Sequence, residues 1–122
     1  MSDSIASQLL QKWVETIKNG DPNQVTLLYD KRGLLLGTFS SDERVGHSAI
    51  SEYFENLLKN SVSVEILSEH PYVWDEVAVN SGLYNFVLPD RTIAARFSFV
   101  YGRNGELWKI ISHHSSVLPQ EN

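Results

Sequence analysis

The sequence predicts an α+β fold in which N-terminal helices pack in a curved, mostly antiparallel sheet. Apolar residues recur every three to four positions through roughly the first 60 residues and every second position after that, which is the change from helical to strand periodicity. Short turn segments separate the later apolar runs, so those strands are expected to pair as hairpins. The chain has 122 residues and no repeats or linker-like stretch. We therefore expect one domain over residues 1–122.

Helical patterns fill most of the first half of the chain. The expected helices are residues 4–18, 21–29 and 46–60. In the first, Ser4 is the expected N-cap and Gly20 the stop. The third is expected to begin near His47 or Ser48. Between the second and third helices, the apolar run at 33–39 is bounded by turn residues and predicts a short strand.

Four longer strands are expected in the second half, where apolar and polar residues alternate. They are residues 61–70, 76–88, 92–102 and 106–117. The segments "LPDRT" and "RNGEL" read as hairpin turns, and the second contains an Asn-Gly pair, which favours type I′ geometry. A sheet of this kind that curls over helices leaves a cavity at its wide end.

Composition and charge exclude several classes of function. The formal net charge is −5 and the ten Lys and Arg residues are dispersed, which argues against a nucleic-acid partner. No apolar run approaches the ~20 residues of a membrane span, and the N-terminus lacks the features of a signal peptide, so we expect a cytoplasmic protein with no membrane partner. Nucleotide-binding glycine motifs are absent, and no cofactor is expected.

Metal chemistry and a serine nucleophile are not favoured either. The chain has no cysteine and four histidines, whereas a zinc site usually needs three or four ligands. The adjacent pair His113 and His114 would point to opposite faces of a strand and would be poor ligands for one ion. No Gly-x-Ser-x-Gly motif marks an activated serine.

The last expected strand ends in four polar residues, "HHSS". Because side chains alternate across a strand, His114 and Ser116 share one face, and His113 and Ser115 share the other. We expect His114 and Ser116 to face the cavity, although the sequence does not fix which pair does so. Alternatively, a histidine could cap the sheet or pair across a subunit interface.

An arginine in the preceding strand is a second candidate. Arg96 and Ser98 share a face opposite Phe97 and Phe99. Directed inward, the Arg96 guanidinium would attract a small carboxylate or bicarbonate. Directed outward, it would be an ordinary solvated side chain.

The order of elements resembles the nuclear transport factor 2-like, or SnoaL-like, superfamily, in which a cystatin-like cone holds a pocket between sheet and helices. The segments "LLGTFSSDERVGHSAISEYFENLL", "VAVNSGLYNFVL" and "ARFSFVYGRNGELWKIISHHSSVLP" are similar to the iota-class carbonic anhydrases and to the calmodulin-dependent protein kinase II association domain. The carbonic anhydrase resemblance implies metal-independent hydration of carbon dioxide to bicarbonate, with a histidine of near-neutral pKa relaying the proton. The implied catalytic residues are Thr38, Tyr53, His114 and Ser116, and the implied substrate-binding residues are Arg96, Ser98, His113 and Ser115.

The association-domain resemblance implies a different function, a non-catalytic domain that binds a small anion or assembles the protein. An isomerase would want a buried carboxylate, and most acidic residues fall on expected loops or polar helix faces. Under either main hypothesis we expect a homodimer or larger homo-oligomer, because the strands supply more aromatic surface than one cone is expected to bury. These aromatic residues are Trp74, Tyr84, Phe86, Phe97, Phe99 and Tyr101.

Overall fold

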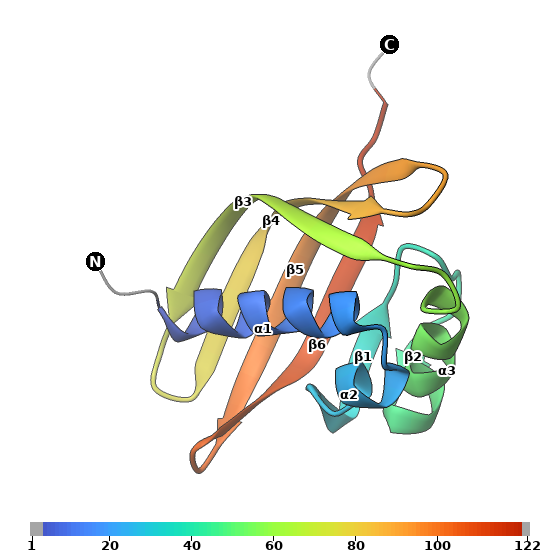
Figure 1. Cartoon of the computed structure of the whole chain (residues 1–122). Coiled ribbons are helices and arrows are strands. Elements are labelled where there is room, and N and C mark those ends of the chain that lie inside the picture. The colour runs from blue at the N-terminus through green and yellow to red at the C-terminus, as the bar shows by residue number, and fades with distance from the viewer. Residues whose placement is uncertain (1–3, 121–122) are drawn as a thin grey trace.

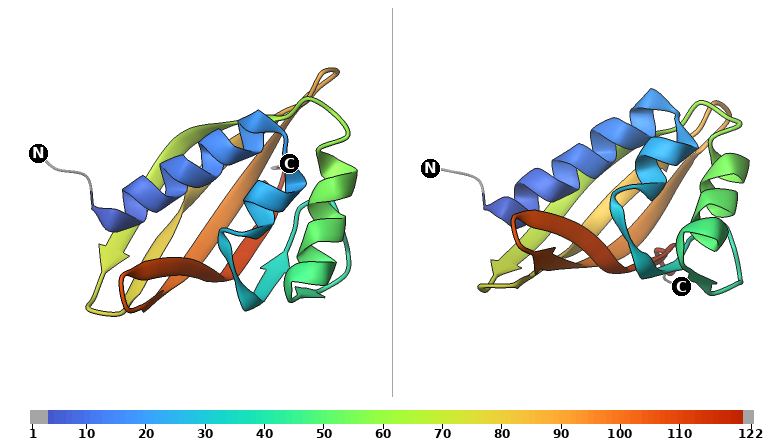
Figure 2. Two further views of the ribbon diagram at one scale, coloured as in Figure 1. Left: turned by 60° about the horizontal axis from the view of Figure 1, so that its bottom comes forward. Right: turned by 90° about the horizontal axis from the view of Figure 1, so that it is seen from below.

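The protein folds as one curved sheet whose inner face is covered by helices (Figure 1). The structure is a computed structural model and describes residues 4–120. Figure 2 shows that the helices lie against the same face of the sheet and leave the other face bare. The elements are α1 (Ile5–Asn19), α2 (Pro22–Thr26), β1 (Tyr29–Leu36), β2 (Arg44–Val45), α3 (His47–Leu57), β3 (Ser63–Val73), β4 (Val77–Val87), β5 (Thr92–Asn104) and β6 (Leu107–Val117).

The six-stranded sheet has the order β2-β1-β6-β5-β4-β3. Neighbouring strands are antiparallel except β1 and β6, which run parallel and pair Leu35 with His113 and Leu36 with His114. Because their carboxyl ends lie at the same edge, the segment that follows β1 is close to the polar end of β6. The α+β class and the mostly antiparallel sheet are confirmed.

The first helix follows its sequence signals closely. Ser4 Oγ accepts a hydrogen bond from the Ser7 backbone N–H, and Gly20 ends the helix with φ 81°. The buried face includes Leu10, Trp13 and Ile17, which repeat at helical spacing. This face packs on β3 and β4 and closes one side of the core. Among residues 4–120, no helix is long and apolar enough to cross a membrane.

The second helix is shorter than its sequence pattern suggests. It ends at Thr26 instead of continuing to Tyr29, and Tyr29 is the first residue of β1. The Ile110 N–H donates to the Leu28 carbonyl at 2.9 Å, so pairing with β6 takes over the residues that would have extended the helix. For the same reason β1 begins four residues before the expected 33–39 strand. The third helix begins at His47 as expected and ends at Leu57, short of residue 60.

The β5–β6 turn has a different geometry from the one that its Asn-Gly pair predicts. Asn104 pairs with Leu107, leaving Gly105 and Glu106 as the loop. Gly105 has φ 65°. Among residues 4–120, every positive φ belongs to a glycine, so Glu106 has a negative φ. A type I′ turn needs positive φ at both central residues, whereas type II′ needs it only at the first. The turn therefore follows the type II′ pattern, and the type I′ prediction is wrong.

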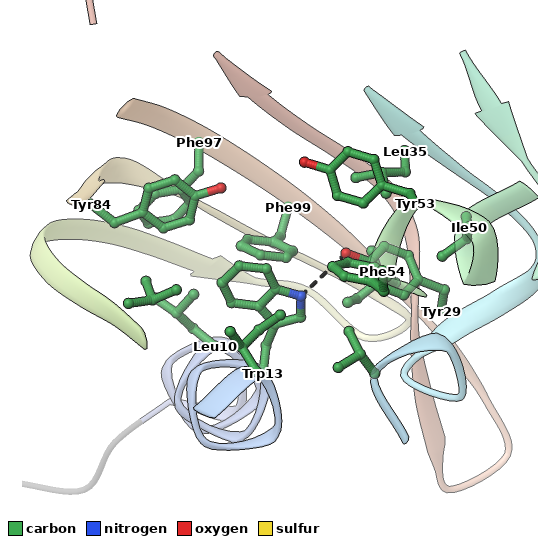
Figure 3. Packing of buried hydrophobic residues seen from close by; sticks show 14 of the residues in the cluster. Leu10, Trp13, Tyr29, Leu35, Ile50, Tyr53, Phe54, Tyr84, Phe97 and Phe99 are labelled. Atoms are coloured by element: carbon green, nitrogen blue, oxygen red, sulfur yellow. Dashed lines mark hydrogen bonds between the residues drawn. The ribbon is translucent and has the colours of Figure 1, made fainter. Parts of the chain in front are cut away.

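The core is rich in aromatic rings that come from the sheet (Figure 3). Trp13 of α1 stacks on Tyr84 with ring centroids 5.8 Å apart and meets Phe99 edge-on at 5.2 Å. Five of the six aromatic residues expected to supply surplus surface are buried here, and only Trp74 is exposed. The expectation that aromatic side chains exceed what one cone can bury is wrong. The buried ones are Tyr84, Phe86, Phe97, Phe99 and Tyr101.

An irregularity in β6 decides which side chains point inward. Val100 pairs with Ser112 and Tyr101 with Ile110, so Ile111 is an extra residue on the β6 side. Such a bulge interrupts strict alternation. Consequently Ile110 and His113, three residues apart, are both buried.

Gly82 permits a close approach between β3 and β4, and its replacement should destabilise the fold. A Cβ at this position would overlap the Ser68 backbone carbonyl oxygen, which cannot move independently of β3. We expect Gly82→Ala to lower the free energy of unfolding by about 3 kcal/mol or more, measured by urea denaturation. In Gly102→Ala, the matched control, the nearest atom is the flexible Ile111 Cγ2 at 3.3 Å, and a loss of about 1 kcal/mol or less is expected. Equal losses in the two variants would contradict this account.

Candidate functional site

The polar end of β6 presents one pair of side chains to each face of the sheet. His113 and Ser115 point inward and are 2% and 4% exposed, respectively. His114 and Ser116 lie on the outer face, where His114 is exposed. The expectation that His114 and Ser116 point to the inner face is wrong because the Ile111 bulge shifts the alternation upstream of them. Both residues nevertheless border the hollow beside Thr38 at the end of the strand.

His113 is held by a hydroxyl on each ring nitrogen. The Tyr29 hydroxyl lies 2.8 Å from Nδ1, and the Tyr84 hydroxyl lies 3.2 Å from Nε2. The Trp13 indole N–H donates to the Tyr29 oxygen at 3.2 Å. Phe99 stacks on the imidazole with centroids 3.8 Å apart. A polar ring is therefore fully satisfied inside an aromatic core.

The hydrogen bonds continue from Tyr84 to the end of the strands. Tyr84 Oη donates to Ser115 Oγ at 2.5 Å, and Ser115 Oγ lies 2.5 Å from Thr38 Oγ1. Thr38 follows β1, and the parallel pairing of β1 with β6 brings it beside Ser115. Six side chains thus form one chain of hydrogen bonds, which we call the polar chain: Trp13, Tyr29, His113, Tyr84, Ser115 and Thr38.

Donor chemistry gives the polar chain a direction. An indole N–H can only donate, so the Tyr29 oxygen accepts from Trp13 and its own proton is available for His113 Nδ1. A neutral imidazole has one N–H, which then lies on Nε2 and donates to Tyr84. Tyr84 donates to Ser115. Either hydroxyl can donate between Ser115 and Thr38. When Ser115 is the donor, the Thr38 hydroxyl proton can donate to a group outside the chain.

Burial keeps every member of the polar chain uncharged. It lowers the pKa of His113 to about 3, and the neighbouring His114 adds to this lowering. Burial also raises the pKa values of the Tyr29 and Tyr84 hydroxyls well above their usual range. A near-neutral proton relay, which the resemblance implies for a histidine, does not describe His113. The polar chain is therefore a series of uncharged hydrogen-bonding side chains.

Thr38 and Ser115 reach a hollow of about 260 Å³ at the shared end of β1 and β6. The hollow is lined by Leu36, Gly37, Thr38, Ser40, Ser41, Asp42, His114, Ser115, Ser116 and Val117. No Lys or Arg belongs to this lining. Nor do three or more His, Asp or Glu side chains converge as metal ligands anywhere in residues 4–120.

Tyr53 supports this hollow from behind. Its hydroxyl accepts from the Phe39 backbone N–H at 3.3 Å, and its ring packs where Gly37 has no side chain. Burial raises the pKa of Tyr53 to about 12, so the hydroxyl remains protonated. Tyr53 fixes the backbone on both sides of Thr38, and its side chain is not among those that line the hollow.

The remaining candidates meet on the outer face of the sheet. Arg96 is exposed and pairs across the strands with Ser116, and Ser98 pairs with His114. A shallow hollow of about 230 Å³ is lined by these four residues and Phe97. The expected site residues are therefore divided between two faces, and Arg96 takes the outward orientation.

Sequence reasoning missed the three aromatic members of the polar chain. Tyr29 lies in the expected second helix, Tyr84 is among the aromatic residues expected at the surface, and Trp13 lies in the expected first helix, where no role is predicted for it. One signal could have found them, because an imidazole buried in a strand needs a partner on each nitrogen. Tyrosine hydroxyls are the long-reaching donors that an aromatic core can supply.

The comparisons with known proteins agree with this architecture. Residues 4–119 match the family model of the calcium/calmodulin dependent protein kinase II association domain. The chain belongs to this association-domain family. A proposed association domain of the same kind from Xanthomonas campestris has 33% sequence identity and a TM-score of 0.90, and the match covers 94% of this chain and 86% of that one. The resemblance to the association-domain family is confirmed.

More distant structures share the fold of this association domain. An NTF2-like protein with a cystatin-like fold from Novosphingobium aromaticivorans has a TM-score of 0.74 at 11% identity, covering 93% of this chain and 80% of that one. A proposed ketosteroid isomerase from Parabacteroides distasonis has a TM-score of 0.81 at 20% identity, covering 95% and 89%. These likenesses confirm the cystatin-like cone. No curated protein sequence matches the chain.

The low pKa of His113 should appear in the pH dependence of stability of this association domain. The unfolded histidine gains a proton near its usual pKa of about 6.5, whereas the folded one does so only near 3. Stability from this group is therefore present above pH 6.5 and is lost as the pH falls toward 3. We expect the free energy of unfolding to drop by about 2–3 kcal/mol between pH 7 and 4.5 through His113.

Urea denaturation across that pH range provides the measurement. His113→Gln should be less stable at pH 7 and should lack this part of the pH dependence. His114→Gln is the matched control, because it alters the adjacent histidine on the outer face, and it should retain the dependence. If His113→Gln kept the same slope, the neutral buried imidazole would be contradicted.

Proposed function

We propose that the hollow at Thr38 hydrates carbon dioxide to bicarbonate without a resident metal ion. The observation that carries this proposal is that the polar chain ends at the Thr38 hydroxyl on the edge of the hollow, where Thr38 can donate outward when Ser115 donates to it. Carbon dioxide is small, uncharged and weakly polar, so it suits a hollow lined by hydroxyl groups, with no Lys or Arg and with one carboxylate, Asp42, that disfavours a bound anion. The resemblance to iota-class carbonic anhydrases, stated above, supports the same reaction.

In the proposed reaction, the site stabilises charge as it develops. A water oxygen bonds to the carbon of carbon dioxide, and one carbonyl oxygen becomes an oxyanion. Thr38 donates to that oxygen, and the chain behind it through Ser115 and Tyr84 polarises the donor. The proton lost from water passes to solvent at the open side of the hollow. Tyr53 contributes by holding the Phe39 backbone and hence the position of Thr38.

Stopped-flow measurement of carbon dioxide hydration tests the proposal. Chelator-treated protein should be active, and Ser115→Ala should lower kcat by ~100-fold because Thr38 loses the hydroxyl partner that orients it. Ser81→Ala is the matched control: its hydroxyl lies 2.8 Å from Ser98 Oγ on the outer face, and its kcat should be unchanged. Hydration no faster than buffer by a folded protein would overturn the proposal. So would equal effects of the two substitutions.

Self-association is the second candidate function, and the bare outer face favours it. Figure 2 shows this face without a covering helix. Leu83 and Ile111 are 37% and 40% exposed, and both extend from strands whose inner residues form the core. A chain of this family, whose name describes association, would cover these apolar groups by pairing with a second copy. This role is compatible with catalysis at the Thr38 hollow, which lies at the end of β1 and β6 and is bordered by residues of both faces.

A charged substitution in the middle of the outer face should weaken self-association. Leu83 pairs across the strands with Arg96, so Leu83→Lys would place two cations together at an interface. We expect the wild type to sediment as a dimer or larger oligomer, and Leu83→Lys to associate at least ~10-fold more weakly. Leu107→Lys, at a position that is 65% exposed in the β5–β6 hairpin, is the control. A monomeric wild type, or dissociation only in the control, would contradict the outer-face interface.

A further inference from the structure

A second hollow, separate from the one at Thr38, lies between the end of α3 and the β4–β5 loop. Figure 1 shows these two segments on the same side of the molecule. The hollow has a volume of about 280 Å³, and we call it the arginine hollow. It is lined by Phe39, Ser40, Arg44, Tyr53, Asn56, Leu57, Asn60, Leu88 and Arg91.

The charge of this lining is unusual for the protein. The chain carries a formal net charge of −5, yet the arginine hollow is lined by two arginines and by no carboxylate. Two asparagines and a serine supply additional neutral donors. A recess with cationic walls in an acidic protein attracts an anionic ligand and repels a cationic one.

The two arginines are held in different ways. Arg44 is 13% exposed at its side chain and is fixed by Glu52 at 2.5 Å and by Ser40 at 3.2 Å. Its Nε is buried and has no hydrogen-bond partner among the described residues. Arg91 is exposed, and within residues 4–120 its guanidinium makes no hydrogen bond or ion pair. The Arg44 guanidinium is therefore held in place before a ligand binds, and the Arg91 side chain is free to close on the ligand.

The remaining walls of the arginine hollow are largely apolar, so a fully hydrated inorganic ion is not the ligand that fits best. Phe39, Leu57 and Leu88 are apolar, and the Tyr53 ring adds an aromatic surface. A cavity of about 150 Å³ is enough to hold benzene, so the arginine hollow has room for a ring with a charged group attached. A guanidinium matches a planar carboxylate with two parallel hydrogen bonds.

We propose that the arginine hollow binds a small organic carboxylate with an aromatic or short apolar body. Arg91 supplies the unpaired positive charge and closes on the carboxylate. Arg44, whose charge is largely offset by Glu52, holds its guanidinium N–H groups in fixed positions at the wall. The apolar walls take the body of the ligand. The proposal does not depend on carbon dioxide hydration, because the arginine hollow and the Thr38 hollow have only Ser40 in common among their lining residues.

Calorimetric titration of the intact protein with benzoate tests this inference. Benzamide is the matched probe, because it has the same shape without the charge. We expect saturable binding of benzoate and at least ~10-fold weaker binding of benzamide. Arg91→Gln should weaken benzoate binding by ~10-fold or more, and its exposed position should leave the fold intact.

Two control variants locate the effect. Arg103→Gln removes an exposed arginine in the β5–β6 hairpin, and Arg96→Gln removes the one on the outer face. Both should bind benzoate like the wild type. Failure of benzoate to bind at millimolar concentration, equal binding of benzamide, or loss of binding only in Arg96→Gln would each overturn the proposal. Carbon dioxide hydration should be measured on the same Arg91→Gln protein. This second measurement separates a failure of the proposed benzoate binding from a failure of the proposed catalysis.

Discussion

The burial of a neutral imidazole in an aromatic core is the constraint on which much of this structure depends. His113 has no access to water, so both ring nitrogens need partners within the protein. Leaving either nitrogen unsatisfied would cost about 1–3 kcal/mol. Tyr29 and Tyr84 meet that need from opposite sides. To place Tyr29 there, the chain must leave α2 early and enter β1, and the Ile111 bulge must direct His113 inward.

The same constraint gives the core its connection to the surface. Tyr84 can accept from His113 only if its own proton goes elsewhere, and Ser115 takes it. The parallel pairing of β1 with β6 then sets Thr38 beside Ser115 at the edge of the sheet. The hydrogen bonds that satisfy the buried imidazole thus continue to a held hydroxyl at the edge of a hollow. Stability and the candidate chemistry share the same side chains.

The sequence predicted the periodic parts of the molecule well and the irregular parts poorly. Regular spacing located α1 and the long strands, and the HHSS segment lies at the end of β6, as the strand pattern predicts. The inward face was misassigned because strict alternation has no way to register one extra residue at Ile111. Tyr29 was misassigned because local helical preference was overridden by pairing with Ile110. The roles of Tyr84 and Trp13 depend on contacts across the core, which a single sequence does not display.

The distribution of charge separates two kinds of ligand. The hollow at Thr38 has no Lys or Arg in its lining and is backed by a chain that stays neutral. An anion held there would lose hydration without gaining a fixed cation, which is costly in a low-dielectric site. A neutral substrate that acquires charge during reaction suits it better, because the oriented donor acts most strongly when the oxyanion forms. The arginine hollow, with Arg44 and Arg91 in its walls, has the opposite character. Anion binding and carbon dioxide hydration therefore belong to different places on this domain, and a ligand in one hollow need not occupy the other.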